Sequence, residues 1–96
     1  MNSKLKSDSM DDLFEAIMSL ETLDECYDFF DDLCTIQEMR SFAQRFQVAG
    51  MLNNKKVFSE IAKETGASTA TISRVNRSLN FGSDGYKSAF EKMNNK

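Results

Sequence analysis

The sequence contains no proline and no histidine, and each absence excludes something. Without proline, no segment of the 96 residues carries the residue that most strongly interrupts a helix. Without histidine, the chain lacks the most frequent general base of enzymes and a frequent zinc ligand. Glycine is scarce as well, and three of the four glycines lie near expected element boundaries. An all-helical chain with short turns is therefore predicted.

Cysteine is also scarce, with only Cys26 and Cys34 present. Their spacing of eight residues matches no zinc motif, and neither thiol has a paired base that would make it a nucleophile. We interpret both as small buried or half-buried apolar residues in a reducing compartment. The sequence thus predicts neither an enzyme nor a metal protein, and it indicates no cofactor.

Long apolar runs are absent: none approaches the ~20 residues of a membrane-spanning helix. The N-terminal MNSKLKSDSMDD has no apolar stretch behind its two lysines and does not resemble a signal peptide. We therefore expect a cytoplasmic protein that does not contact a membrane. The length fits a single domain, residues 1–96, of a size that benefits from oligomerisation.

Charge is distributed unevenly along the chain, although the net charge is only −3. Residues 1–34 carry ten acids and two bases, whereas residues 35–96 carry ten bases and five acids. The acidic pI of about 4.9 therefore does not exclude a polyanionic partner. What matters is whether the bases share one face.

Apolar residues repeat at helical spacing along most of the chain, and side chains suited to helix caps precede several segments. Thr22 with Glu25, and Thr35 with Glu38, have the spacing of capping boxes. Ser68 or Thr69 is expected to begin another helix, and Ser83 to cap the last. The predicted organisation is a flexible N-terminus (1–8), dimerisation helices (9–56), a helix-turn-helix (57–79) and a C-terminal helix (83–93).

Aromatic side chains surround more than one side of the first two predicted helices, at Phe14, Tyr27, Phe29 and Phe30. A monomer of this size has little interior in which to bury them. We therefore expect burial between subunits, most simply in a twofold homodimer.

Residues 58–79 have the pattern of a helix-turn-helix. Ala62, Gly66 and Ile72 have the offsets of that motif, and glycine suits a left-handed turn. The expected inner face consists of Ile61, Ala62, Ile72, Val75 and Leu79. The expected DNA-binding residues on the outer face and flanks are Ser68, Thr69, Ala70, Ser73, Arg74 and Arg77. Because residues 65–79 include no acid, this face suits double-stranded DNA, with small side chains toward base edges and arginines toward phosphates.

The stretches IAKETGASTATISRVNRSL and LCTIQEMRSFAQRFQVAGML resemble the Trp repressor superfamily, particularly its Trp-repressor-like YerC/YecD branch. The resemblance is close over about residues 33–79 and extends to the flanking helices in pattern only. It implies six helices, an intertwined homodimer and two reading helices in successive major grooves about 34 Å apart. The function implied is a sequence-specific transcriptional regulator, most simply a repressor.

The resemblance also implies a pocket for a tryptophan corepressor, formed by Thr35, Arg45, Arg74 and Ser78. However, Val75 replaces the glycine that follows the second arginine in the Trp repressor. Its isopropyl group is expected to project where the planar ligand would lie. Arg45 would then pair with an acid or support the reading helix, and no tryptophan cofactor is predicted.

A protein-interaction module that reuses a helix-turn-helix scaffold is the alternative function. The acidic N-terminal half, which could meet a basic partner, supports it. The lack of acid on the reading helix argues against it.

We predict that L-tryptophan does not bind in the micromolar range, because filling a planar slot with a few methyl groups costs roughly 1–3 kcal/mol. Isothermal titration calorimetry with L-tryptophan measures this directly. Micromolar affinity would contradict the interpretation of Val75.

Overall fold

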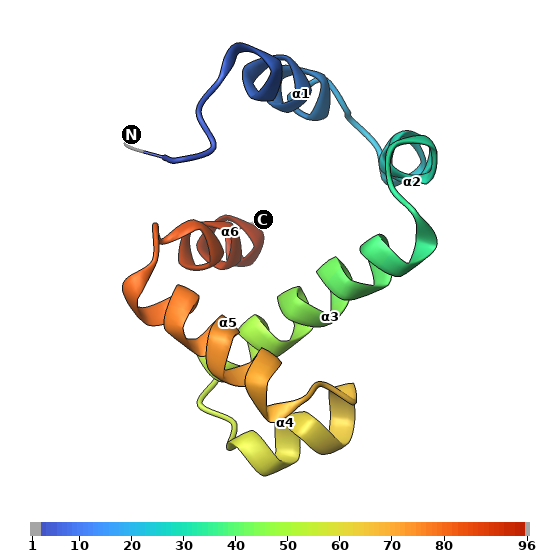
Figure 1. Cartoon of the computed structure of the whole chain (residues 1–96). Coiled ribbons are helices and arrows are strands. Elements are labelled where there is room, and N and C mark those ends of the chain that lie inside the picture. Colours follow the sequence, from blue (N-terminus) through green and yellow to red (C-terminus); the bar gives the residue numbers. More distant parts are fainter. Residues whose placement is uncertain (1–2, 96) are drawn as a thin grey trace. The chain divides into compact units, whose positions relative to one another are not determined.

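The computed structural model describes residues 3–95 and consists of six α-helices (Figure 1). The described residues include no strand, so the predicted all-α, six-helix fold is confirmed. The helices are α1 (Asp8–Met18), α2 (Leu23–Leu33), α3 (Ile36–Asn53), α4 (Phe58–Thr65), α5 (Thr69–Phe81) and α6 (Gly85–Asn94). They form two compact units, one up to Ile36 and one from Gln37 onward, and each is described by itself. Residues 1 and 2 of the predicted flexible N-terminus lie outside the described residues.

The N-terminal unit consists of two helices with capped starts. α1 begins at Asp8, one residue earlier than predicted, because Ser7 Oγ accepts the Met10 N–H at 3.1 Å. α2 begins with the predicted capping box. Thr22 Oγ1 accepts the Glu25 N–H, and the Glu25 carboxylate accepts the Thr22 N–H, both at 3.1 Å. These bonds satisfy amide groups that have no partner within the helix.

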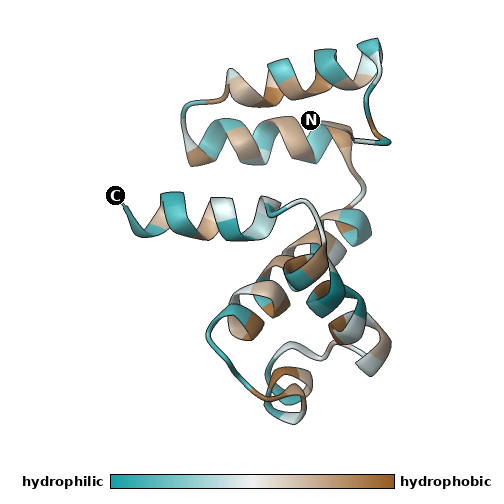
Figure 2. Ribbon diagram, turned by 90° about the vertical axis from the view of Figure 1, so that its left-hand side faces the viewer, coloured by the Kyte–Doolittle hydropathy of each residue, from teal (hydrophilic) through white to brown (hydrophobic). Residues whose placement is uncertain are grey.

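Neither α1 nor α2 contains a fully buried residue. Met18, Leu23 and Tyr27 are all at least 75% exposed. Phe29 and Phe30 make an edge-to-face contact with each other, with ring centroids 5.3 Å apart. Figure 2 shows hydrophobic residues among hydrophilic ones along both helices. The two helices of this unit therefore leave several large apolar side chains exposed and bury none of them completely.

The C-terminal unit contains the hydrophobic core, in which α5 lies across α3 and beside α4 (Figure 1). The core residues are Val48, Ala49, Leu52, Ile61, Ala67, Ile72, Val75 and Leu79. From α6, Tyr86 and Phe90 pack against this core. Phe46 of α3 lies against Phe90, with ring centroids 5.0 Å apart, yet it remains 39% exposed. The apolar side of α3 is thus buried only toward its C-terminal end.

The turn between α4 and α5 is fixed by hydrogen bonds around a left-handed glycine. Gly66 has a φ of 73°, and its N–H donates to Ala62 O at 2.9 Å. Thr65 Oγ1 donates to Ile61 O and accepts the Ala67 N–H. These bonds hold the angle between the two helices.

The start of α6 differs from the prediction that Ser83 caps it. Asp84 occupies the N-cap position with a φ of 63°, and no side-chain cap bond forms. Aspartate tolerates the left-handed conformation better than most residues, which lets the chain turn directly into Gly85. The Ser83 cap is therefore wrong by one residue.

We predict that Gly66→Ala lowers the free energy of unfolding by about 1–2 kcal/mol. An added Cβ at Gly66 meets no atom within 4 Å, so the cost comes from the backbone conformation alone. Denaturant unfolding followed by circular dichroism measures it.

Gly85→Ala is the matched control, since an added Cβ there also meets nothing within 4 Å and the φ is not positive. It should stabilise the protein by up to about 1 kcal/mol. Equal effects of the two changes would contradict the role assigned to the Gly66 conformation.

Candidate nucleic-acid interface

The inner face of the helix-turn-helix is almost completely buried. Ile61 of α4 is 0% exposed, and Ile72 and Val75 of α5 are 1% and 2% exposed. Leu79 continues this stripe by one further turn, at 4%. The predicted inner face is confirmed except for Ala62, which is only partly buried. This packing fixes the rotation of α5 about its own axis.

The six predicted DNA-binding residues are all exposed: Ser68, Thr69, Ala70, Ser73, Arg74 and Arg77. At 100° per residue, Thr69, Ser73 and Arg77 lie within one narrow strip of α5. Ala70 borders this strip, and Arg74 lies farther round the helix. The structure therefore brings five of the six candidate residues onto one continuous side of α5, while Ser68 precedes the helix as its N-cap.

Ser68 differs from the other five because its hydroxyl already has partners. Its Oγ accepts the Thr71 N–H at 3.1 Å and lies 3.0 Å from Thr71 Oγ1. It is the N-cap of α5 and confirms the predicted start of that helix. Its side chain thus orients the first turn of the helix.

The outer side of α5 is positively charged and lacks compensating acids. Among residues 3–95, no carboxylate forms an ion pair with Arg74 or Arg77. The first turn of α5 contains no acidic residue. The N–H groups at the start of a helix add partial positive charge. This side can therefore accept phosphates without first breaking an ion pair.

The residues of the implied corepressor pocket lie in both units. Thr35 belongs to the N-terminal unit, whereas Arg45, Arg74 and Ser78 belong to the C-terminal unit. The Arg45 guanidinium lies over the Phe42 ring, with its Cζ 5.1 Å from the ring centroid. Of the two roles expected for Arg45, pairing with an acid is not found among the described residues, where its partner is an aromatic ring, a favourable contact for a cation.

Val75 belongs to the hydrophobic core between α3, α4 and α5. Its isopropyl group is directed inward from α5, beside the exposed Arg74. Val75 therefore contributes to the stability of the helix-turn-helix, in addition to any effect on a ligand.

Gln44 was not singled out from the sequence, but it stabilises the turn that precedes the candidate DNA-binding helix α5. Its Nε2 donates to Thr65 O at 3.0 Å and so ties α3 to the turn before α5. The available signal was its position one helical turn before Val48, on the side of α3 that is buried farther along.

Residues 3–95 show neither a candidate metal site nor a candidate membrane-spanning helix. These residues contain no group of three or more His, Cys, Asp or Glu side chains placed to hold a metal ion. None of the described helices is long and apolar enough to cross a membrane.

The buried inner face, the left-handed turn and the exposed outer side of α5 define a helix-turn-helix protein. The chain belongs to the Trp repressor protein family, whose model matches residues 8–94. It is 54% identical to the protein YerC of Bacillus subtilis (strain 168) over 90 residues, 94% of this chain and 86% of YerC. This match supports its place in the YerC branch of the family.

Solved structures agree with this assignment. A TrpR-like protein from Eubacterium eligens ATCC 27750 is 58% identical, with a TM-score of 0.92 over 97% of this chain and 96% of that one. A protein from Staphylococcus aureus is 50% identical, with a TM-score of 0.91 over 97% of this chain and 93% of that one.

We predict that Val75→Gly lowers the free energy of unfolding by about 3 kcal/mol. A glycine inside a helix costs about 1 kcal/mol, and losing a buried valine side chain costs about 2 kcal/mol. Thermal and denaturant unfolding measure the sum. Ala70→Gly, at an exposed position of the same helix, should show only the first cost. Equal losses in the two variants would contradict the core role of Val75.

Proposed function

We propose that this protein is a sequence-specific DNA-binding transcriptional regulator that inserts α5 into the major groove. The observation that carries the proposal is the combination of a buried inner face with an exposed, acid-free outer side on one helix. Membership of the Trp repressor protein family supports it. This family consists of regulators, so we propose no enzymatic activity.

The outer residues of α5 are given different roles by their size and charge. Thr69 and Ala70, in the first turn, allow close approach to base edges. Ser73 lies one turn farther along the same strip and can donate or accept a hydrogen bond. Arg74 and Arg77 suit phosphate oxygens, because a guanidinium can form two parallel hydrogen bonds with them.

We further propose that the protein acts as a homodimer. Several large apolar side chains of α1 and α2 are exposed, including Met18, Leu23 and Tyr27, as is much of the first half of α3, including Phe42 at 45%. A second copy offers the same surfaces and can cover them in a twofold arrangement. Two copies would also present two reading helices to successive major grooves.

The simplest regulatory outcome that we propose is repression by blocking access to a promoter. A protein with this role acts in the cytoplasm, where the DNA lies. We propose that tryptophan is not the effector. The valine at position 75 supports this proposal.

Duplexes selected by this protein from a random pool should contain two related half-sites about one helical turn apart. Binding to a selected duplex should weaken steeply with salt, because neutralised phosphates release counterions. The selection, followed by fluorescence anisotropy at several salt concentrations, tests both. Arg77→Ala should reduce the salt slope by about 1 and weaken binding to all sequences alike.

Thr69→Ala is the matched change at a base-facing position. It should leave the salt slope unchanged and alter the preferred sequence. A pool that enriches no sequence, together with the absence of salt-sensitive duplex binding, would overturn the proposed function and favour the protein-interaction alternative.

A further inference from the structure

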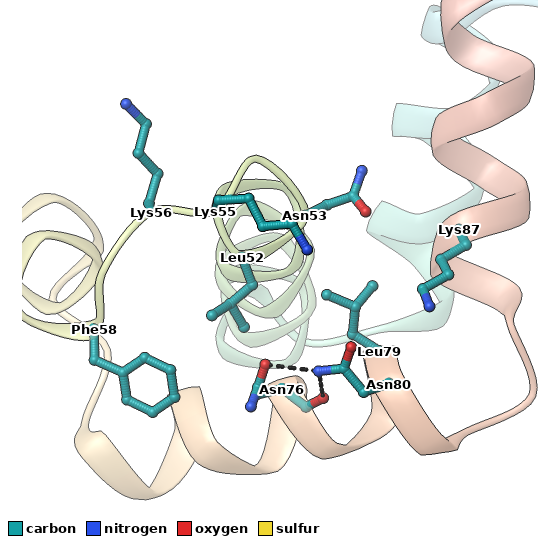
Figure 3. A pocket seen from close by; sticks show the side chains of 9 residues that line it. All are labelled: Leu52, Asn53, Lys55, Lys56, Phe58, Asn76, Leu79, Asn80 and Lys87. Atoms are coloured by element: carbon teal, nitrogen blue, oxygen red, sulfur yellow. Dashed lines mark hydrogen bonds between the residues drawn. The ribbon is translucent and has the colours of Figure 1, made fainter.

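A second group of bases surrounds a pocket of about 300 Å³ in the C-terminal unit. This volume is at the lower end of the range for small-molecule sites. The lining residues are Leu52, Asn53, Lys55, Lys56, Phe58, Asn76, Leu79, Asn80 and Lys87 (Figure 3). Three of the nine are lysines and none is acidic. The pocket is therefore suited to a negatively charged molecule.

Two of the three lysines are available for a ligand. In Figure 3, Lys55 and Lys87 extend toward the pocket from the α3–α4 turn and from α6, whereas Lys56 points away. Among the described residues, Lys55 and Lys87 have no carboxylate partner, while Lys56 Nζ lies 4.0 Å from Glu60 Oε1. Two unpaired ammonium groups that converge on one cavity favour an anion between them.

Lys55 reaches the pocket from an unusual backbone conformation. Its φ is 65°, in the left-handed region that favours glycine. The Lys55 N–H donates to Leu52 O and the Lys56 N–H donates to Met51 O, both at 3.0 Å. This is the hydrogen-bond pattern of a helix end at which glycine is the usual residue. The fold requires the left-handed conformation at this position but not a lysine side chain. Lysine is less stable than glycine in this conformation, so its presence needs another reason.

The rest of the pocket combines amides with an apolar surface. Asn80 Nδ2 donates to both the backbone oxygen and Oδ1 of Asn76 at 2.9 Å, which orients these two side chains at the wall. Leu52 and Leu79 are buried beneath, and Phe58 remains 40% exposed. A ligand with an apolar group can contact Phe58 while its charged group meets the lysines.

This pocket is separate from the implied corepressor residues. At 100° per residue, Asn76 and Asn80 lie on the opposite flank of α5 from Arg74 and Ser78. On the same helical wheel Asn80 falls between Thr69 and Ser73 and Asn76 borders them, so a molecule bound here would lie beside the proposed DNA-reading surface.

We propose that the pocket is a binding site for a small organic anion, in which Lys55 and Lys87 hold a phosphate or carboxylate group and Phe58 contacts an apolar group. The proposal concerns binding to the free protein and does not depend on the proposed function. A phosphate of the DNA backbone could meet the same lysines in place of a small molecule. The experiments below distinguish these two sources of the anion.

Titration of the isotope-labelled full chain with phenyl phosphate, followed by NMR, tests the proposal. The resonances of Lys55, Asn76, Asn80 and Lys87 should shift together and saturate. Inorganic phosphate lacks the apolar group and benzyl alcohol lacks the charge, so each should bind about tenfold more weakly or worse. No saturable shift at the pocket, or shifts confined to Arg74 and Arg77, would overturn the proposal.

Two variants separate loss of binding from loss of folding. Lys55→Gly should bind phenyl phosphate about tenfold more weakly while its unfolding midpoint does not fall, because glycine suits the left-handed position. Lys87→Gln should show a similar loss of affinity. Lys92→Gln, on the same helix but outside the pocket, should bind normally, and Lys56→Gln should lose much less than Lys55→Gly. Equal losses in all four variants would contradict the assigned geometry.

Duplex binding of Lys55→Gly and Lys87→Gln identifies the source of the anion. We expect the salt slope of both variants to match that of the unchanged protein. A slope reduced by about 1 in each, combined with no phenyl phosphate binding, would assign the lysines to the DNA backbone and overturn the proposal.

Discussion

Burial of the inner face of α5 against α3 and α4 is the contact on which the rest of the C-terminal unit depends. Ile72, Val75 and Leu79 are each at most 4% exposed, and they pack with Val48 and Ile61 in a core of eight buried residues among residues 3–95. Protein cores are close-packed. A rotation of α5 about its axis would therefore expose part of this core. The rotation of α5 is therefore fixed, and with it the set of side chains that face outward.

Acidic and basic residues are separated along the chain, and this separation leaves the outer side of α5 positively charged. The acids gather in the first 34 residues, while Arg74 and Arg77 occupy an acid-free stretch of α5. A net charge of −3 describes neither half of the chain. The proposed contact of α5 with DNA needs a local positive field, and the turn at Gly66 orients the start of α5 that contributes to this field.

The N-terminal helices α1 and α2 differ from the C-terminal unit in what stabilises them. They are capped and amphipathic, yet none of their residues is fully buried. Local hydrogen bonds determine where these helices begin, whereas the packing of the two helices buries none of their apolar side chains completely. We propose a second copy of the chain as the partner that covers their apolar side chains.

Sequence alone determined the features that depend on neighbours along the chain. The capping box at Thr22, the N-cap at Ser68, the left-handed Gly66 and the inner stripe of α5 all follow from local hydrogen bonding, backbone sterics or helical periodicity. Only the tertiary structure decided what depends on residues distant in sequence. It joined Gln44 to Thr65 and brought Lys55 and Lys87 to one pocket from different elements. Helical spacing specifies which side of a helix is apolar, but only the packed helices specify what that side and its flanks will meet.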